Sequence, residues 1–303
     1  MSEPSGLLIV NKHVGVTSHD IVGKVRRLYG TRRVGHTGTL DPMASGVLVV
    51  LIGRAAKAAE YLVADEKEYR ALLQLGLTTD TEDVTGTVLS RCETLPDEDE
   101  VRSVCGRFVG ELMQIPPMYS ALKQGGQKLC DLARQGVVVE RPARPITVHR
   151  LLCEATETAD TYRLDVRCSS GTYIRTLCAD IGAALGCGGV MAALERTRTG
   201  GFSLAESYTV AALEEMSEAE RLACLIPTER LFDGLPAVRL SEFFERLCRG
   251  GCEIYQKKIR VDYPIGQRVR ICSHDGSFFA LGEVREYPEG SAIKALKLFD
   301  LGD

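Results

Sequence analysis

An uninterrupted apolar run, VLVVLI at Val47–Ile52, constrains the fold of this chain more than any other feature. Apolar residues rich in β-branched side chains, without alternation, are typical of a strand buried on both faces. The preceding segment Gly35–Gly46, GHTGTLDPMASG, is polar and glycine-rich, and predicts a tight loop that holds His36 and Asp41. Pro42 fixes its own φ and keeps Asp41 out of the helical region. An aspartate there is compatible with a nucleophile, a base or a turn former, and the loop alone favours the turn former.

Strand and helix signals alternate irregularly along the rest of the first 230 residues. Apolar residues alternate over Tyr69–Leu75 and again over Tyr162–Cys168, which predicts two half-buried strands. Apolar residues at helical spacing over Ile174–Leu185 predict an amphipathic helix. Because no regular βαβ rhythm appears, the expected fold class is α+β with a mixed sheet.

A chain of 303 residues is long for a single core, and a second unit is expected from about Leu231. A short helix at Ser241–Arg249 precedes several short strands separated by turns, beginning with IRV at Ile259–Val261. This pattern predicts a small β-barrel or sandwich. The expected domains are therefore residues 1–230 and residues 231–303.

Charge is unevenly distributed along this chain of net charge −4. Residues 121–150 carry six basic and two acidic side chains, whereas residues 80–100 carry eight acidic and one basic. Such segregation suits a protein with a basic face and an acidic back, although solvated charged faces without a partner give the same pattern.

Cysteine spacing and hydropathy exclude several classes of protein. The 11 cysteines form no CxxC pair, so buried thiols are expected rather than a disulfide framework or a metal site. No apolar run reaches membrane-spanning length, and the segment MSEPSG has no secretory character. A cytoplasmic protein with no membrane partner is expected.

Five separated motifs carry a resemblance to a known family. Gly35–Leu48 closely resembles the signature loop of the bacterial tRNA pseudouridine synthase B family, which modifies uridine 55 of the tRNA T loop. The resemblance continues, in the family's order and over almost the whole chain, through residues 6–18, 67–86, 115–126 and 168–189. It implies a pseudouridine synthase fold with a mixed, largely antiparallel central sheet flanked by helices. A small β-barrel-like, PUA-like RNA-binding domain is implied at the C-terminus.

The resemblance also implies an activity. The expected enzyme isomerises uridine 55 by flipping the base and by cleaving and re-forming the glycosidic bond with an aspartate. The expected partner is the T-arm stem-loop of tRNA. No cofactor, metal or obligatory protein partner is expected.

Five pocket residues are implied by position within the family motifs. Asp41 matches the nucleophile, and Arg175 in GTYIRTL matches the arginine that pairs with it. Tyr69 in KEYRALL matches the tyrosine that stacks on the uracil and is implicated in removing the proton from C5. His36 matches the histidine that helps hold the flipped RNA, and Leu194 matches an apolar residue of the base pocket.

The implied RNA contacts are basic residues. Residues 121–150 match the insertion that clasps the T loop, and the expected contacts there and near the N-terminus are Lys12, Lys123, Lys128, Arg141 and Arg144. The chain departs from the family pattern at His13, Cys130 and Glu195, which stand where proline, tyrosine and arginine are usual.

Three other functions were weighed. A guide-RNA-dependent, dyskerin-like pseudouridine synthase shares GTYIRTLC, but the IPPMYSALK motif and the long insertion favour the stand-alone tRNA enzyme. A tRNA-folding protein without catalysis is the second alternative, and the presence of Asp41 and Arg175 disfavours it. A nucleotide-binding enzyme using the glycines at 186–189 is the third, but no GK[ST] follows them.

Overall fold

The computed structural model describes residues 3–61, 66–120 and 122–300. Their largest element is a nine-stranded sheet whose main path runs β1, β3, β12, β4, β11, β10, β7. The strands on this path are β1 (Gly6–Lys12), β3 (Ala44–Ile52), β12 (Gly189–Thr199), β4 (Lys67–Leu75), β11 (Thr161–Cys168), β10 (Arg144–Ala155) and β7 (Gly110–Gln114). Two further strands lie off the path: β2 (Val34–Thr37) pairs with β3, and β13 (Phe202–Ser203) pairs with β12.

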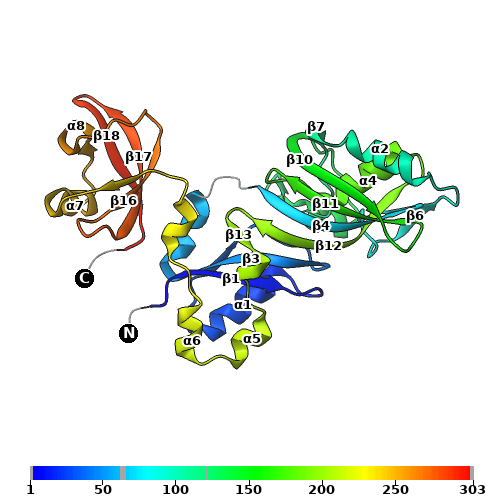
Figure 1. The fold of residues 1–303 in the computed structure, drawn as a ribbon, viewed down its shortest axis with the longest axis horizontal. Coiled ribbons are helices and arrows are strands. Elements are labelled where there is room, and N and C mark those ends of the chain that lie inside the picture. The colour runs from blue at the N-terminus through cyan, green and yellow to red at the C-terminus, as the bar shows by residue number, and fades with distance from the viewer. Residues whose placement is uncertain (1–2, 62–65, 121, 301–303) are drawn as a thin grey trace.

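Helices cover each half of this sheet separately (Figure 1). On the β1–β3 half, the covering helices are α1 (Ser18–Leu28), α5 (Val210–Glu215) and α6 (Glu218–Ala223). On the β4–β7 half, they are α2 (Glu98–Gly106) and α4 (Ile174–Ala184). The remaining elements are short: the hairpins β5 (Leu77–Thr79)–β6 (Val88–Arg91) and β8 (Lys123–Gln124)–β9 (Gln127–Lys128), helix α3 (Leu129–Arg134), and the 3-10 helices η1 (Gly53–Tyr61), η2 (Leu204–Glu206) and η3 (Thr228–Phe232).

The apolar run does form a strand buried on both faces. One face of β3, with Leu48 and Val50, packs in a core that includes α1 and α5. The other face, with Val47 and Val49, packs against η1 and Phe202. Burial on both faces explains why this segment lacks the alternation of a half-exposed strand.

The two halves of the sheet meet along β12. This strand pairs parallel with β3 on one side and antiparallel with β4 on the other. Gly46 makes the β3 contact possible, because a Cβ on it would lie only 2.2 Å from the carbonyl oxygen of Arg196. Its φ of +106° is also a conformation that favours glycine. The remaining strand pairs of the sheet are antiparallel, so the expected mixed, largely antiparallel α+β architecture is confirmed.

One local expectation was wrong. His36 does not lie on a loop, because residues 34–37 form β2 and pair with β3 in the register His36↔Val50. The turn is confined to residues 38–43, and Asp41 lies on it as expected. Because residues 34–37 pair with β3, those of their backbone N–H and C=O groups that face this strand are hydrogen-bonded within the sheet. In a longer loop, these groups would have to bond to water.

The C-terminal residues form a separate five-stranded sheet in the order β14 (Ala237–Arg239), β16 (Arg268–Cys272), β17 (Phe278–Tyr287), β18 (Gly290–Leu298), β15 (Ile254–Tyr255). Helices α7 (Glu242–Arg249) and α8 (Gln256–Ile259) pack with it. The strand expected at Ile259–Val261 was wrong: α8 ends there and Arg260 is left-handed, with φ of +56°. The domain boundary at 230/231 stays a prediction.

The C-terminal sheet packs on the first unit through an apolar cluster. Phe232, Leu281 and Phe299 bury against Ala58 of η1, and Phe278 and Phe299 stack with their centroids 5.5 Å apart. Figure 1 shows this sheet beside η1 and η3, far from α2 and α4. Among the described residues, no helix is long and apolar enough to cross a membrane.

Gly46→Ala tests the close approach of β3 and β12. A methyl group there must push the two backbones apart, and we expect a loss of about 3 kcal/mol in the free energy of unfolding. The measurement is urea denaturation. Gly35→Ala is the matched control, because a Cβ on Gly35 meets no atom within 4 Å. Equal stability of the two variants would show that the contact is not tight.

Candidate active site

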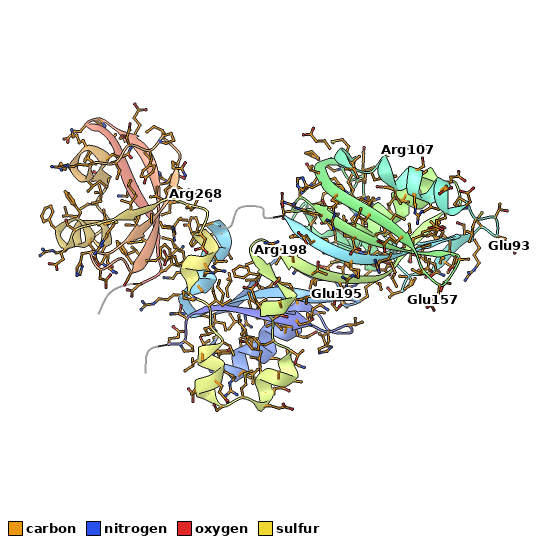
Figure 2. All side chains as sticks on the ribbon, viewed as in Figure 1. Glu93, Arg107, Glu157, Glu195, Arg198 and Arg268 are labelled. Atoms are coloured by element: carbon orange, nitrogen blue, oxygen red, sulfur yellow. The ribbon has the colours of Figure 1, made fainter. Side chains whose placement is uncertain are left out.

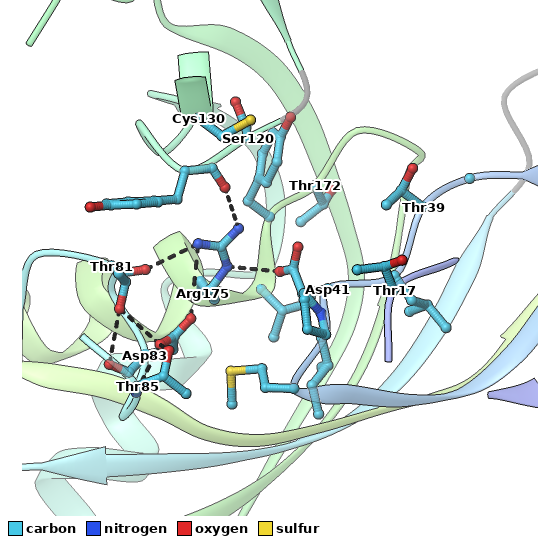
Figure 3. Close-up of a pocket in the computed structure, with 18 of the residues that line it drawn as sticks. Thr17, Thr39, Asp41, Thr81, Asp83, Thr85, Ser120, Cys130, Thr172 and Arg175 are labelled. Atoms are coloured by element: carbon cyan, nitrogen blue, oxygen red, sulfur yellow. Dashed lines mark hydrogen bonds and ion pairs between the residues drawn. The ribbon is translucent and has the colours of Figure 1, made fainter. Parts of the chain in front are cut away.

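A pocket of about 880 Å³ opens where the two halves of the sheet meet (Figure 3). Its walls come from the loop before β3, from β4 and β12, from the residues after β5, and from the start of α4. The residues that line it include Asp41, Tyr69, Asp83, Tyr119, Tyr173, Arg175 and Leu194. Among the described residues, no group of His, Cys, Asp or Glu gathers as a metal site would require.

Asp41 and Arg175 form an ion pair inside this pocket. Oδ2 of Asp41 lies 2.9 Å from Nε of Arg175. The arginine side chain is 5% exposed and the aspartate side chain 38% exposed, so the carboxylate faces the pocket while its partner lies in the wall. A planar guanidinium held in this way fixes the orientation of the carboxylate.

The rest of the Arg175 guanidinium is held by backbone carbonyls. Nη1 donates to the Thr81 carbonyl at 3.1 Å, and Nη2 donates to the Tyr119 carbonyl at 2.7 Å. These bonds leave the arginine little freedom to turn away from Asp41. A buried cation with several satisfied donors also avoids much of the cost of leaving water.

Asp83 fixes the loop that supplies one of those carbonyls. Its Oδ1 accepts from the Thr81 hydroxyl at 2.8 Å, and from the Thr85 hydroxyl at 2.6 Å and backbone nitrogen at 2.9 Å. Its Oδ2 lies 4.0 Å from Nη1 of Arg175, so a second carboxylate shares the buried cation. Figure 3 shows Asp83 below Arg175, on the opposite side from Asp41. The segment TDTEDVTG belongs to one of the five family motifs, but the sequence alone indicates no role for Asp83.

Gln114 at the end of β7 fixes the start of the α4 helix. Its amide oxygen accepts from the Tyr173 backbone nitrogen at 2.9 Å, and its amide nitrogen donates to the Tyr173 carbonyl at 3.0 Å. Arg175 follows Tyr173 by two residues. The buried Gln114 amide, which comes from a strand distant in the sequence, therefore helps fix the position of Arg175 in the pocket wall. Sequence reasoning missed Gln114, because a glutamine at the end of a strand has no distinguishing pattern.

Tyr69 and Leu194 lie on neighbouring strands of the pocket floor. Tyr69 is 7% exposed, and burial raises the pKa of its phenol, while the charge of Arg196 and a side-chain hydrogen bond from it act in the opposite direction. Leu194 pairs with Ala71 of β4 and Ala44 of β3, at the seam of the sheet. The structure thus gathers four sequence-predicted residues, Asp41, Tyr69, Arg175 and Leu194, around one pocket, and their chemical roles stay predictions.

Lys12 lies beneath the loop rather than on a surface that faces RNA. It is 0% exposed, and Nζ donates to the carbonyls of His13 at 3.0 Å, Val16 at 2.9 Å and Pro42 at 3.4 Å. Burial lowers the pKa of this lysine to about 8, and the nearby Asp41 charge partly opposes the shift. The direct RNA contact expected of Lys12 does not fit this position, because its donors already hold the loop that carries Asp41.

His36 lies outside the pocket lining. Its Nδ1 is buried without a hydrogen-bond partner. Burial lowers the pKa of its imidazole, and the charge of Arg196 adds to the shift. The predicted role in holding flipped RNA stays untested by this geometry.

The expected insertion, residues 121–150, reaches the mouth of the pocket at Cys130 and Arg134. Arg141 is tied to the backbone, since Nη1 donates to the Pro116 carbonyl at 2.9 Å. Arg144 is exposed at the start of β10. Ala121 and the side chains of Lys123 and Lys128 lie outside what the structure describes, so the RNA contacts expected of the two lysines stay predictions.

Comparison with known proteins identifies the family. Residues 26–174 match the TruB family pseudouridylate synthase N-terminal domain, and residues 175–233 match the tRNA pseudouridylate synthase B C-terminal domain. A protein named tRNA pseudouridine synthase B from Alkaliphilus oremlandii is 40% identical over 97% of this chain and 98% of its own length. One of the same name from Pseudomonas fluorescens is 43% identical over 93% and 92%.

Solved structures agree with this result. The chain superposes on the structure of a Cbf5-Nop10-Gar1 complex with a TM-score of 0.74 and 27% identity, over 97% of this chain and 85% of that one. An archaeal box H/ACA sRNP Nop10-Cbf5 complex gives a TM-score of 0.70 with 25% identity, over 98% and 87%. These similarities define a pseudouridine synthase, an isomerase, as expected. The chain belongs to the TruB family of pseudouridylate synthases.

The ionisation of His36 gives a pH-dependent prediction. Because burial holds the pKa of His36 below its ordinary value of 6.5, the imidazole is neutral at pH 7 in the folded protein. The unfolded chain binds this proton at higher pH than the folded chain. The contribution of His36 to stability is therefore complete above about pH 6.5 and declines as pH falls through the folded pKa.

NMR titration of the imidazole signals, assigned with His36→Gln, checks this directly. We expect a midpoint below 6.5. A midpoint at or above that value would contradict the burial of a neutral ring.

Proposed function

We propose that this enzyme converts uridine 55 in the T loop of tRNA to pseudouridine. The observation that carries the proposal is the Asp41–Arg175 ion pair inside a pocket whose floor contains Tyr69. The signature loop that places Asp41, and the names of relatives about 40% identical over nearly the whole chain, support tRNA as the substrate. The position within tRNA and the mechanism are our inference.

The reaction breaks the N1–C1′ bond of uridine and forms a C5–C1′ bond, so the atoms of the product equal those of the substrate. The base must leave the folded loop to enter the pocket, at a cost of a few kcal/mol. Asp41 then attacks as a carboxylate and divides one difficult step into two easier ones. The attack on ribose, the attack on uracil and a glycal path all remain compatible with the position of Asp41.

Arg175 would orient the carboxylate for this attack and remain charged throughout. Tyr69 would stack against the uracil, and its phenolate oxygen would take the C5 proton once the new bond has formed, while N1 gains a proton from water. Leu194 would close the apolar side of the pocket. Each role fits a group that touches the pocket, and the isomerisation needs no oxidant, reductant or cosubstrate.

A guide-RNA-dependent enzyme is the second candidate, and the structural similarity to Cbf5 complexes favours it. The higher identity to proteins named tRNA pseudouridine synthase B favours the stand-alone enzyme. Tritium release from a T-arm minihelix labelled at C5 of uridine, with this protein alone, separates the two. Release without other components supports the proposal, and release only with a guide RNA overturns it.

The mode of T-arm binding, the absence of a protein partner and the cellular location are also part of the proposal. The insertion and the C-terminal sheet would hold the T arm, with no protein partner, in the cytoplasm. Basic residues of the insertion lie near the pocket mouth, which supports this arrangement.

Asp41→Asn tests the nucleophile. The amide keeps the shape of the side chain but cannot attack, so we expect turnover to fall by roughly a thousandfold or more. Affinity for tRNA should stay within about threefold, because carbonyls of Thr81 and Tyr119 still hold Arg175. Asp99→Asn, on the exposed first turn of α2, is the matched control. Turnover near that of the wild type would remove Asp41 from the mechanism.

Neutralising Lys123, Lys128 and Arg144 to glutamine tests the RNA-binding face. If each contacts a phosphate, the log–log dependence of binding on salt should flatten by about 0.7 to 0.9 per residue. Single-turnover rates at saturating enzyme should change less, because the proposed chemistry is carried by Asp41, Tyr69 and Arg175 rather than by these residues.

The control triple variant neutralises exposed arginines elsewhere: Arg102, Arg107 and Arg163. Figure 2 shows Arg107 at the end of α2. Equal salt slopes for the two triple variants would place the RNA on another surface.

A further inference from the structure

Arg196 on β12 is a wholly buried arginine, 0% exposed, whose guanidinium is bound by backbone carbonyls. Nε donates to the Val47 carbonyl at 2.8 Å, Nη2 to the Gly38 carbonyl at 3.1 Å, and Nη1 to the Thr39 carbonyl at 3.5 Å. Within the described part of the chain, no carboxylate lies within ion-pair distance of it. Burying a cation without a carboxylate partner costs free energy of folding, which points to a function of Arg196 beyond packing.

The register of the sheet places Arg196 between the two reacting groups. It is the direct cross-strand partner of Tyr69 on β4 and of Gly46 on β3. Side chains of directly opposed residues lie on the same face of a sheet, close enough to interact. The carbonyls that Arg196 binds at Gly38 and Thr39 belong to the turn that carries Asp41. One guanidinium therefore contacts the loop of the nucleophile on one side and Tyr69 on the other.

The electrostatics of Tyr69 agree with this position. Burial raises the pKa of the Tyr69 phenol and so disfavours the phenolate, the form that can accept the C5 proton. The positive charge of Arg196 and a side-chain hydrogen bond from it act against that rise.

We propose that Arg196 is a positioning residue that fixes Tyr69 relative to Asp41 and orients the Tyr69 hydroxyl for transfer of the C5 proton. The inference rests on the proposed function, since it concerns how that reaction is arranged. Arg196 does not line the pocket and so acts through Tyr69 and the loop rather than by touching RNA.

Arg196→Lys is the informative substitution. It keeps the charge but replaces the planar fork with an ammonium that cannot bond the carbonyls of Val47, Gly38 and Thr39 together while it lies beside Tyr69. Arg198→Lys is the matched control, because Arg198 is exposed on the same strand and its Nε donates only to the nearby Gly200 carbonyl. Figure 2 shows Arg198 projecting from the end of β12.

Single-turnover conversion of tRNA at saturating enzyme measures the effect. We expect Arg196→Lys to slow the reaction about 100-fold, since a displacement near 1 Å between reacting groups costs that much. Affinity for tRNA should stay within about threefold, and Arg198→Lys should resemble the wild type. An inactive wild type would reject the proposed function itself, whereas an active wild type with an equally active Arg196→Lys would reject only the role of Arg196.

A double-mutant cycle with Tyr69→Phe separates positioning from mere stability. If Arg196 acts through the Tyr69 hydroxyl, Arg196→Lys should slow Tyr69→Phe by no more than about threefold. The rise of the wild-type rate with pH should also move to higher pH in Arg196→Lys, because Tyr69 loses a favourable donor. Additive losses and an unmoved pH profile would overturn the proposal.

Folding is checked by the thermal midpoint of each variant. If Arg196→Lys fails to fold, Arg196→Gln, which keeps an uncharged donor, takes its place in the same cycle. If neither variant folds, the proposal is also overturned, because Arg196 then serves to hold the two halves of the sheet together.

Discussion

The close contact between β3 and β12 is the constraint on which the rest of the structure depends. Gly46 lets the backbone of one half of the sheet touch the backbone of the other at Arg196. The loop before β3 carries Asp41, and the strand on the other side of β12 carries Tyr69. Any widening of this contact would separate the two side chains that the proposed reaction needs together.

Three buried cations hold loops of the site in place, in addition to the buried carboxylate of Asp83. Lys12, Arg175 and Arg196 are each at most 5% exposed, and each donates to backbone carbonyls of segments without regular structure. Loops normally lie at the surface, because their carbonyls need water. Here, cationic side chains from strands and a helix donate hydrogen bonds to these carbonyls in place of water. The loops can therefore stay fixed beneath the pocket. Only Arg175 also meets carboxylates, Asp41 at 2.9 Å and Asp83 at 4.0 Å, which distinguishes it from the other two.

The sequence predicted individual strands and helices better than the contacts between segments far apart in the chain. The run at Val47–Ile52 and the alternation at Tyr69–Leu75 follow from side-chain patterns, and both strands formed. Resemblance to family motifs brought Asp41 and Arg175 to attention before any geometry was known. Gln114 and Arg196 were missed, because their importance depends on contacts with residues far away in the sequence, at Tyr173 and Gly38. The burial of Lys12 was not foreseen for a similar reason: a lysine is seldom buried unless several carbonyls converge on it, and that convergence depends on tertiary contacts.

The packing of η1 against the C-terminal sheet has a geometric consequence. Strand β3 starts beside the turn that holds Asp41 and continues directly into η1, where Ala58 packs on Phe232 and the Tyr61 carbonyl accepts from Arg268. Nine strand residues at about 3.3 Å each give a span near 30 Å. Because β3 is buried on both faces, this span is stiff. An RNA that touched the C-terminal sheet while one of its bases entered the pocket would have to span that fixed length.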